Sequence, residues 1–131
     1  MRLAVAATLA LALPAAAEDL RSAPDYFVES VMRTSTANIL AVNCAGLSVD
    51  LGAISQLSAE ILDRLTEDGF TPRILAEEMA DPSEAIAVLQ DAFLAKHGLA
   101  TGASEAAVCA AGRAEIAEGS EIGALLLEVD G

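Results

Sequence analysis

The 131-residue chain is poor in aromatic and basic residues. It has no tryptophan, one tyrosine and three phenylalanines, which argues against a carbohydrate-binding cleft because such clefts use aromatic rings as platforms. Lysine and arginine number 7 against 20 aspartates and glutamates, so the formal net charge is −13. The few basic residues are scattered along the sequence. Binding to nucleic acid or to an anionic membrane needs a clustered basic surface, so the sequence excludes both.

Histidine occurs once, as His97 next to Gly98. This position predicts a residue in the last turn of a helix, where the helix dipole favours a positive charge. The sequence contains none of the patterns H-E-x-x-H, G-x-S-x-G or a P-loop, and a histidine base would need a nucleophile. We therefore expect no catalytic residue, no cofactor and no metal site.

Two groups of acidic residues lie near the ends of two predicted helices. They are Asp63, Glu67 and Asp68, and Glu77, Glu78 and Asp81. Either group could hold Ca²⁺ weakly, but neither has the loop pattern of strong calcium sites. A pair of carboxylates could also act as acid and base in a hydrolase. A solvated acidic surface explains both groups more simply.

No apolar run is long enough to cross a membrane. The longest covers eleven residues, 3–13, whereas a helix needs about 20 to span the bilayer. Arg2 precedes this run, and Pro14 and three alanines follow it, which is typical of a Sec-type signal peptide. We predict that residues 1–17 are cleaved and that residues 18–131 form one periplasmic or secreted domain. A retained N-terminal anchor is the alternative.

The chain has two cysteines, Cys44 and Cys109. Disulfides persist in exported proteins, and two cysteines allow a single intramolecular pairing. We predict a structural disulfide between them. A redox pair or two metal thiolates are the alternatives, but no C-x-x-C motif or histidine cluster supports them.

Apolar residues recur at intervals of three and four, and no alternating pattern indicates a strand. Thr71-Pro72 and Ser104 are typical of helix starts, and Gly69 and Gly98 of helix ends. We also predict a capping box at residues 22–25. The predicted helices cover about residues 23–44, 48–68, 72–79, 82–97 and a last helix that follows residue 104. The fold class is therefore all-α, as a compact single-domain bundle of four to six helices with one disulfide.

The last predicted helix is interrupted by Gly112, Gly119 and Gly123. Glycine in a helix costs roughly 0.5–1 kcal/mol relative to alanine. A phosphate cradle would follow a strand, and the charges of this segment exclude a membrane helix. We predict that the three glycines let a neighbouring helix approach closely, with a bend or restart of the helix at Gly119-Ser120 as the alternative. Arg113 has no acid four residues away, so it forms a tertiary ion pair, remains in solvent or binds an anionic ligand.

Two motifs, NCAGLS at residues 43–48 and GRAEIAEGSEIGALL at residues 112–126, resemble the DUF5333 family of small exported proteins of Rhodobacter-like alphaproteobacteria. The resemblance implies a helical, disulfide-linked periplasmic protein. The family has no assigned activity, so the resemblance transfers no catalytic residue to this chain.

The absence of a catalytic pattern, the apolar stripes and the predicted disulfide favour a non-enzymatic module that binds a protein or peptide between helices. An acid-stress chaperone of the periplasm is the first alternative, because the loss of charge from 20 carboxylates at low pH could loosen the fold. A hydrolase that uses a pair among Asp63, Glu67, Glu77 and Glu78 is the second alternative.

Overall fold

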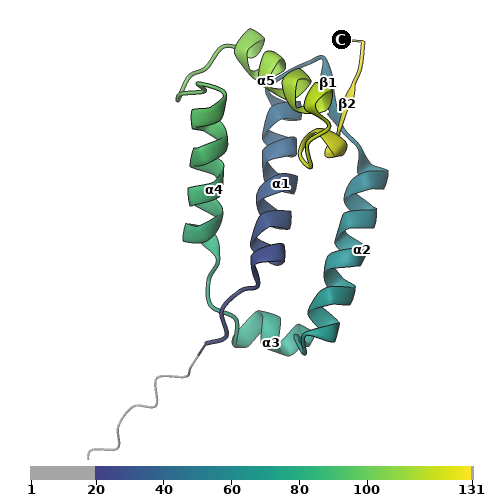
Figure 1. Cartoon of the computed structure of the whole chain (residues 1–131), viewed down its shortest axis with the longest axis vertical. Coiled ribbons are helices and arrows are strands. Elements are labelled where there is room, and N and C mark those ends of the chain that lie inside the picture. The colour runs from purple at the N-terminus through teal and green to yellow at the C-terminus, as the bar shows by residue number, and fades with distance from the viewer. Residues whose placement is uncertain (1–19, 131) are drawn as a thin grey trace, which may run out of the picture.

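The computed structural model describes residues 20–130 and contains five α-helices (Figure 1). The predicted signal peptide, residues 1–17, lies outside the described residues. The helices are α1 (Asp25–Val42), α2 (Leu51–Glu67), α3 (Pro72–Glu77), α4 (Ser83–Lys96) and α5 (Glu105–Glu118). The predicted all-α bundle of four to six helices is therefore confirmed. No helix within residues 20–130 has the length and hydropathy needed to cross a membrane.

Helix α1 lies between α4 and α2, and α5 covers the end at which α1 finishes (Figure 1). The hydrophobic core is gathered at this end of the molecule. Its buried members are Ala37, Leu40, Cys44, Leu47, Phe93, Cys109, Ala111, Ile122, Leu125 and Leu126. In α2 only Leu65 is buried, and in α4 only Phe93. The core thus joins α1 to α5 and leaves much of α2 and α4 exposed.

The predicted disulfide is present between Cys44 and Cys109, with 5.2 Å between the Cα atoms. It links the residues just after α1 to the second turn of α5. Both cysteines are buried in the core, so the covalent link and the apolar packing hold the same two elements together.

A small antiparallel sheet was not predicted. Strand β1 (Leu47–Val49) pairs with β2 (Leu126–Glu128), and Ser48 faces Leu127 across the ladder. Three residues are too few to show the alternation by which strands are recognised. Because β1 occupies the start of the segment predicted as the second helix, α2 begins at Leu51, after Asp50. The side chain of Asp50 accepts a hydrogen bond from the backbone N–H of Ala53 and caps α2.

Most other helix boundaries follow the predicted signals. Thr71 and Ser104 accept hydrogen bonds from the third residue that follows each of them. Gly69 has φ +80°, and the N–H of Phe70 donates to the carbonyl of Leu65 at 2.8 Å, which is the predicted helix stop. The capping box predicted at residues 22–25 is wrong, because Pro24 precedes α1 and no side chain caps the helix there.

The predicted role of the three glycines in helix packing is wrong for Gly119. Helix α5 ends at Glu118, and Gly119 follows it with φ +64° and open space around its Cα. Gly119 is the only one of the three with a positive φ, which suits the residue that ends a helix.

Gly112 and Gly123 are both closely packed. A Cβ on Gly112 would collide with Cδ1 of Leu47, and a Cβ on Gly123 would collide with the carbonyl oxygen of Glu115. Their neighbours are therefore the residue that begins β1 and the backbone of α5, rather than a separate helix. Close approach is the reason for glycine at both positions.

Candidate functional site

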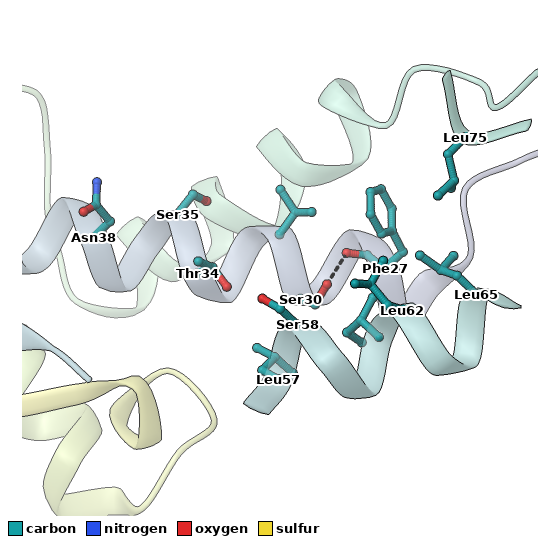
Figure 2. Close-up of a pocket in the computed structure, with 12 residues that line it drawn as sticks. Phe27, Ser30, Thr34, Ser35, Asn38, Leu57, Ser58, Leu62, Leu65 and Leu75 are labelled. Carbon is teal, nitrogen blue, oxygen red and sulfur yellow. Dashed lines mark hydrogen bonds between the residues drawn. The ribbon is translucent and has the colours of Figure 1, made fainter. Parts of the chain in front are cut away.

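A groove of about 580 Å³ lies between α1 and α2, and α3 contributes to one end of it (Figure 2). The two helices run in opposite directions along the groove (Figure 1). The lining residues are Phe27, Ser30, Val31, Thr34, Ser35 and Asn38 of α1, Leu57, Ser58, Ile61, Leu62 and Leu65 of α2, and Leu75 of α3. A volume of this size is typical of ligand sites in proteins.

The sequence of α1 explains why the groove is not filled. Residues 34–38, with the sequence TSTAN, are all part of one continuous helix. Thr36 and Ala37 face the core and are buried, whereas Thr34, Ser35 and Asn38 line the groove. Such short side chains cannot fill the space opposite the leucines of α2.

Two of the small polar side chains on α1 are held by their own helix. The hydroxyl of Ser30 donates to the carbonyl of Phe27 at 2.8 Å, a bond drawn in Figure 2, and the hydroxyl of Ser35 donates to the carbonyl of Met32 at 3.0 Å. Ser35 also accepts a hydrogen bond from the amide of Gln90 in α4. These bonds fix the side chains on the groove wall and leave lone pairs of their oxygens available to a ligand.

Helix α2 forms the apolar wall. Its apolar stripe is the most regular in the chain, yet Leu65 is its only buried residue. Leu62 is 59% exposed, and Leu51, at the other end of α2, is 73% exposed. An amphipathic helix normally packs its apolar face against the protein, but in α2 this face also lines the groove, and Leu62 is available there for a further contact.

None of the twelve residues that line the groove carries a charge, although charged residues make up 21% of the chain. Glu60, Asp63 and Glu67 occupy the solvent-exposed remainder of α2. The groove is therefore an uncharged surface in a strongly acidic protein. It offers no cation to bind a carboxylate or phosphate.

A second cluster of chemically interesting residues joins α4 to α5. The side chain of Glu115 in α5 is 3% exposed, and its Oε1 lies 2.6 Å from Nε2 of His97 and 2.9 Å from Nζ of Lys96. Lys96 also pairs with Glu118 at 2.8 Å. The ring of His97 lies against that of Phe93, with 4.8 Å between centroids.

The electrostatics of this cluster favour the charged form of Glu115. Burial raises the pKa of Glu115, but hydrogen bonds from Ser120, His97 and Lys96 outweigh burial and lower its pKa to about 2. The hydrogen bonds to Glu118 and Glu115 raise the pKa of Lys96. Each of the four residues Lys96, His97, Glu115 and Glu118 has a partner in the cluster, which is the arrangement of a structural ion pair.

His97 was predicted in the last turn of a helix, and the structure places it one position later, as the C-cap directly after Lys96 of α4. Its contact with Glu115 was not predicted. The signal available in the sequence was the position of Glu115 three residues after Gly112, on the face of α5 that also carries the buried Ala111. An acid on a buried helix face requires a basic partner. Only tertiary contacts identify that partner as His97 and Lys96.

Arg113 forms an ion pair, but with a strand rather than with another helix. Its Nε lies 3.7 Å from Oε1 of Glu128 in β2, and both side chains are more than half exposed. Arg113 also lies close to Gly46, where an added Cβ would be 2.9 Å from its Nη2. The described contacts therefore place Arg113 beside the sheet.

Among the acidic residues considered for calcium binding or hydrolysis, Asp68, Glu77, Glu78 and Asp81 have hydrogen-bond or ion-pair partners. Asp68 accepts a hydrogen bond from the hydroxyl of Tyr26 at 2.7 Å, Glu77 and Glu78 pair with Arg73, and Asp81 accepts from Ser83. Residues 20–130 bring together no group of three or more histidine, cysteine or acidic side chains that could hold a metal ion.

Comparison with known proteins identifies one family. The family described as "Family of unknown function (DUF5333)" matches residues 19–127, and the chain belongs to this family. No curated protein and no solved structure matches the sequence.

Proposed function

We propose that this member of the DUF5333 family is a non-enzymatic module of the periplasm that binds an apolar segment of another protein in the groove between α1 and α2. The observation that supports this proposal most directly is the exposure of Leu62 on the apolar face of α2, where it lines the groove. The groove provides a concave surface beside that face. A predominantly apolar cleft with a few polar groups is the usual form of a ligand site.

The core uses only the first part of the apolar face of α2. The buried cluster is built from α1, β1, α4, α5 and the C-terminal segment, and Ala53, Ile54 and Leu57 are the residues of α2 that pack against it. Ile61, Leu62 and Leu65 lie farther along α2 and line the groove. Retaining apolar residues at exposed positions is costly for solubility, and a binding role accounts for them.

Charge favours a cationic occupant. The net charge of −13 creates a field that attracts a positively charged partner and repels a second copy of this chain. The groove itself is uncharged. We therefore propose a segment whose apolar residues enter the groove and whose lysines or arginines remain in solvent near the acidic surface.

Leu62 provides a specific test. The probe is a fluorescent nine-residue peptide of leucine, lysine and serine, and its affinity is measured by fluorescence anisotropy at low salt. Leu62→Asn should weaken binding at least fivefold, because burial of a leucine side chain contributes about 1.5–3 kcal/mol. Since Leu62 is 59% exposed, the thermal midpoint should change little.

Val88 is the matched control. It lies on α4, outside the groove, and is 62% exposed. Val88→Asn removes a similar amount of exposed apolar surface and should leave peptide affinity unchanged. Equal affinities of the Leu62 and Val88 variants, or no binding of the peptide to the wild type, would exclude the groove as the site.

A second function, an acid-stress chaperone, is favoured by the low pKa of Glu115. An ordinary carboxylate in water takes up a proton near pH 4, whereas Glu115 has a pKa of about 2. At pH 3 the link between α4 and α5 would therefore persist while much of the surface charge is lost. If an acid-sensitive client protein aggregates equally with and without this protein at pH 3, the chaperone proposal fails.

A further inference from the structure

The groove has two chemically different ends. Figure 2 shows Phe27, Leu62, Leu65 and Leu75 grouped toward one end and Thr34, Ser35 and Asn38 toward the other. No charged side chain lines either end. The lining therefore changes along the groove from purely apolar to neutral and hydrogen-bonding.

The difference arises from the order of residues in α1 and the direction of α2. The first half of α1 contributes Phe27 and Val31, and its second half contributes Thr34 and Asn38. Because α2 runs in the opposite direction (Figure 1), its final turns bring Leu62 and Leu65 to the apolar end.

The apolar end is also the closed end. Helix α3 places Leu75 there. The turn between α2 and α3 is anchored by Arg21, which donates to the carbonyls of Asp68 and Gly69 at 3.0 and 3.1 Å. The guanidinium of Arg21 lies 3.9 Å from the centre of the Phe70 ring, a distance typical of a cation–π contact. These contacts hold α3 in place across the end of the groove.

We infer that the groove recognises a peptide in which the apolar residues form one continuous block next to a polar, uncharged or cationic block. This inference rests on the proposed function and specifies its partner. The apolar block contacts Phe27, Leu62 and Leu75, and the neighbouring polar residues hydrogen-bond to Thr34 and Asn38. A peptide whose apolar residues are spread along its whole length would bring polar side chains to the apolar end, where they lose hydrogen bonds to water without replacement, and apolar side chains to the polar end.

Two peptides of identical composition test this inference against the full-length, disulfide-intact protein. The block peptide has four leucines at one end, followed by serines and lysines, and the scrambled peptide spaces the same leucines three residues apart along its whole length. Fluorescence anisotropy should show at least tenfold tighter binding of the block peptide. Equal binding of the two peptides would overturn the block preference while leaving the groove as a binding site. Failure of both peptides to bind would overturn the proposed function as well.

Two variants then assign the two ends. Leu75→Asn, in α3, should weaken binding of the block peptide about tenfold and reduce the difference in affinity between the block and scrambled peptides. Thr34→Val keeps the shape of the side chain and removes its hydroxyl, so it should weaken binding of the block peptide threefold to tenfold. When the serines of the peptide are replaced by alanine, Thr34→Val should no longer change the affinity. Circular dichroism confirms that each variant is folded. If neither variant changes the preference between the peptides, the assignment of the ends is overturned.

Discussion

Oε1 of Glu115 lies 2.6 Å from Nε2 of His97 and connects α5 to the end of α4. Glu115 is the only buried acidic residue within residues 20–130, and His97 is the only histidine of the chain. Lys96 completes the arrangement from the adjacent position. The two helices are thus joined by a charged contact beneath the surface, in addition to the apolar core.

Replacement of Glu115 should change the pH dependence of stability. Its pKa falls from the ordinary value of 4.5 to about 2 on folding. A lowered folded-state pKa contributes stability above pH 4.5, and that stability is lost as the pH falls from 4.5 toward 2. The contribution is roughly 3 kcal/mol, from about 1.4 kcal/mol for each pKa unit. Urea unfolding of wild type and Glu115→Gln between pH 2 and 6 should show a difference that shrinks as the pH decreases.

Glu118→Gln is the control for this experiment, since Glu118 also contacts Lys96 but its side chain is 51% exposed. It should lower the free energy of unfolding by less than about 1 kcal/mol, as is usual for exposed ion pairs. Parallel stability curves for wild type and Glu115→Gln across this pH range would contradict the role given to Glu115.

Gly112→Ala should destabilise the protein because the new Cβ collides with Cδ1 of Leu47. Overpacking of this kind typically costs about 1–3 kcal/mol. In a Leu47→Ala background the same substitution should cost much less, because the colliding atom is absent. Chemical denaturation of the two single variants and the double variant measures this coupling. Additive effects would show that Leu47 is not the cause.

Removal of the disulfide should have a large effect on stability. Cys44 and Cys109 are separated by 65 residues, and closing a loop of that length contributes about 4 kcal/mol in the chain-entropy model. The double variant Cys44→Ser, Cys109→Ser should therefore unfold at a clearly lower urea concentration. A midpoint equal to that of the wild type would mean that apolar packing alone holds α1 against α5.

Arg113→Ala should change stability by no more than about 0.5 kcal/mol, because its ion pair with Glu128 is long and exposed. Arg33 is the useful comparison. Its side chain is 18% exposed and pairs with both Glu29 and Glu121, so Arg33→Ala should cost more. A large loss of unfolding free energy for Arg113→Ala, together with no change for Arg33→Ala, would contradict the expected order of the two ion pairs.

The helices could be predicted largely from local signals. Thr71 and Ser104 precede helices as caps, and Gly69 ends α2, because each of these residues satisfies the backbone of its own segment. The start of α1 was misjudged because Ser22 fits the capping-box pattern, yet its segment pairs with residues near Met79. Contacts between distant segments decided that boundary.

The groove could be predicted only in part. The apolar stripe of α2 and the short polar residues of α1 are both visible in the sequence, but their juxtaposition depends on how α1 and α2 pack. The contact between Glu115 and His97 is likewise not encoded by spacing, since the two residues are on different helices. Sequence periodicity identifies the apolar face of a helix but not the element that packs against that face.

The sequence by itself determined the helical class, most helix boundaries and the pairing of Cys44 with Cys109, because backbone capping, apolar periodicity and a single pair of cysteines are local or countable properties. The tertiary structure alone decided the β1–β2 pairing and the burial of Glu115. These features depend on which segments meet in space. The same packing covers Ala53, Ile54 and Leu57 of α2 but leaves Leu62 exposed beside the groove that we propose as the binding site.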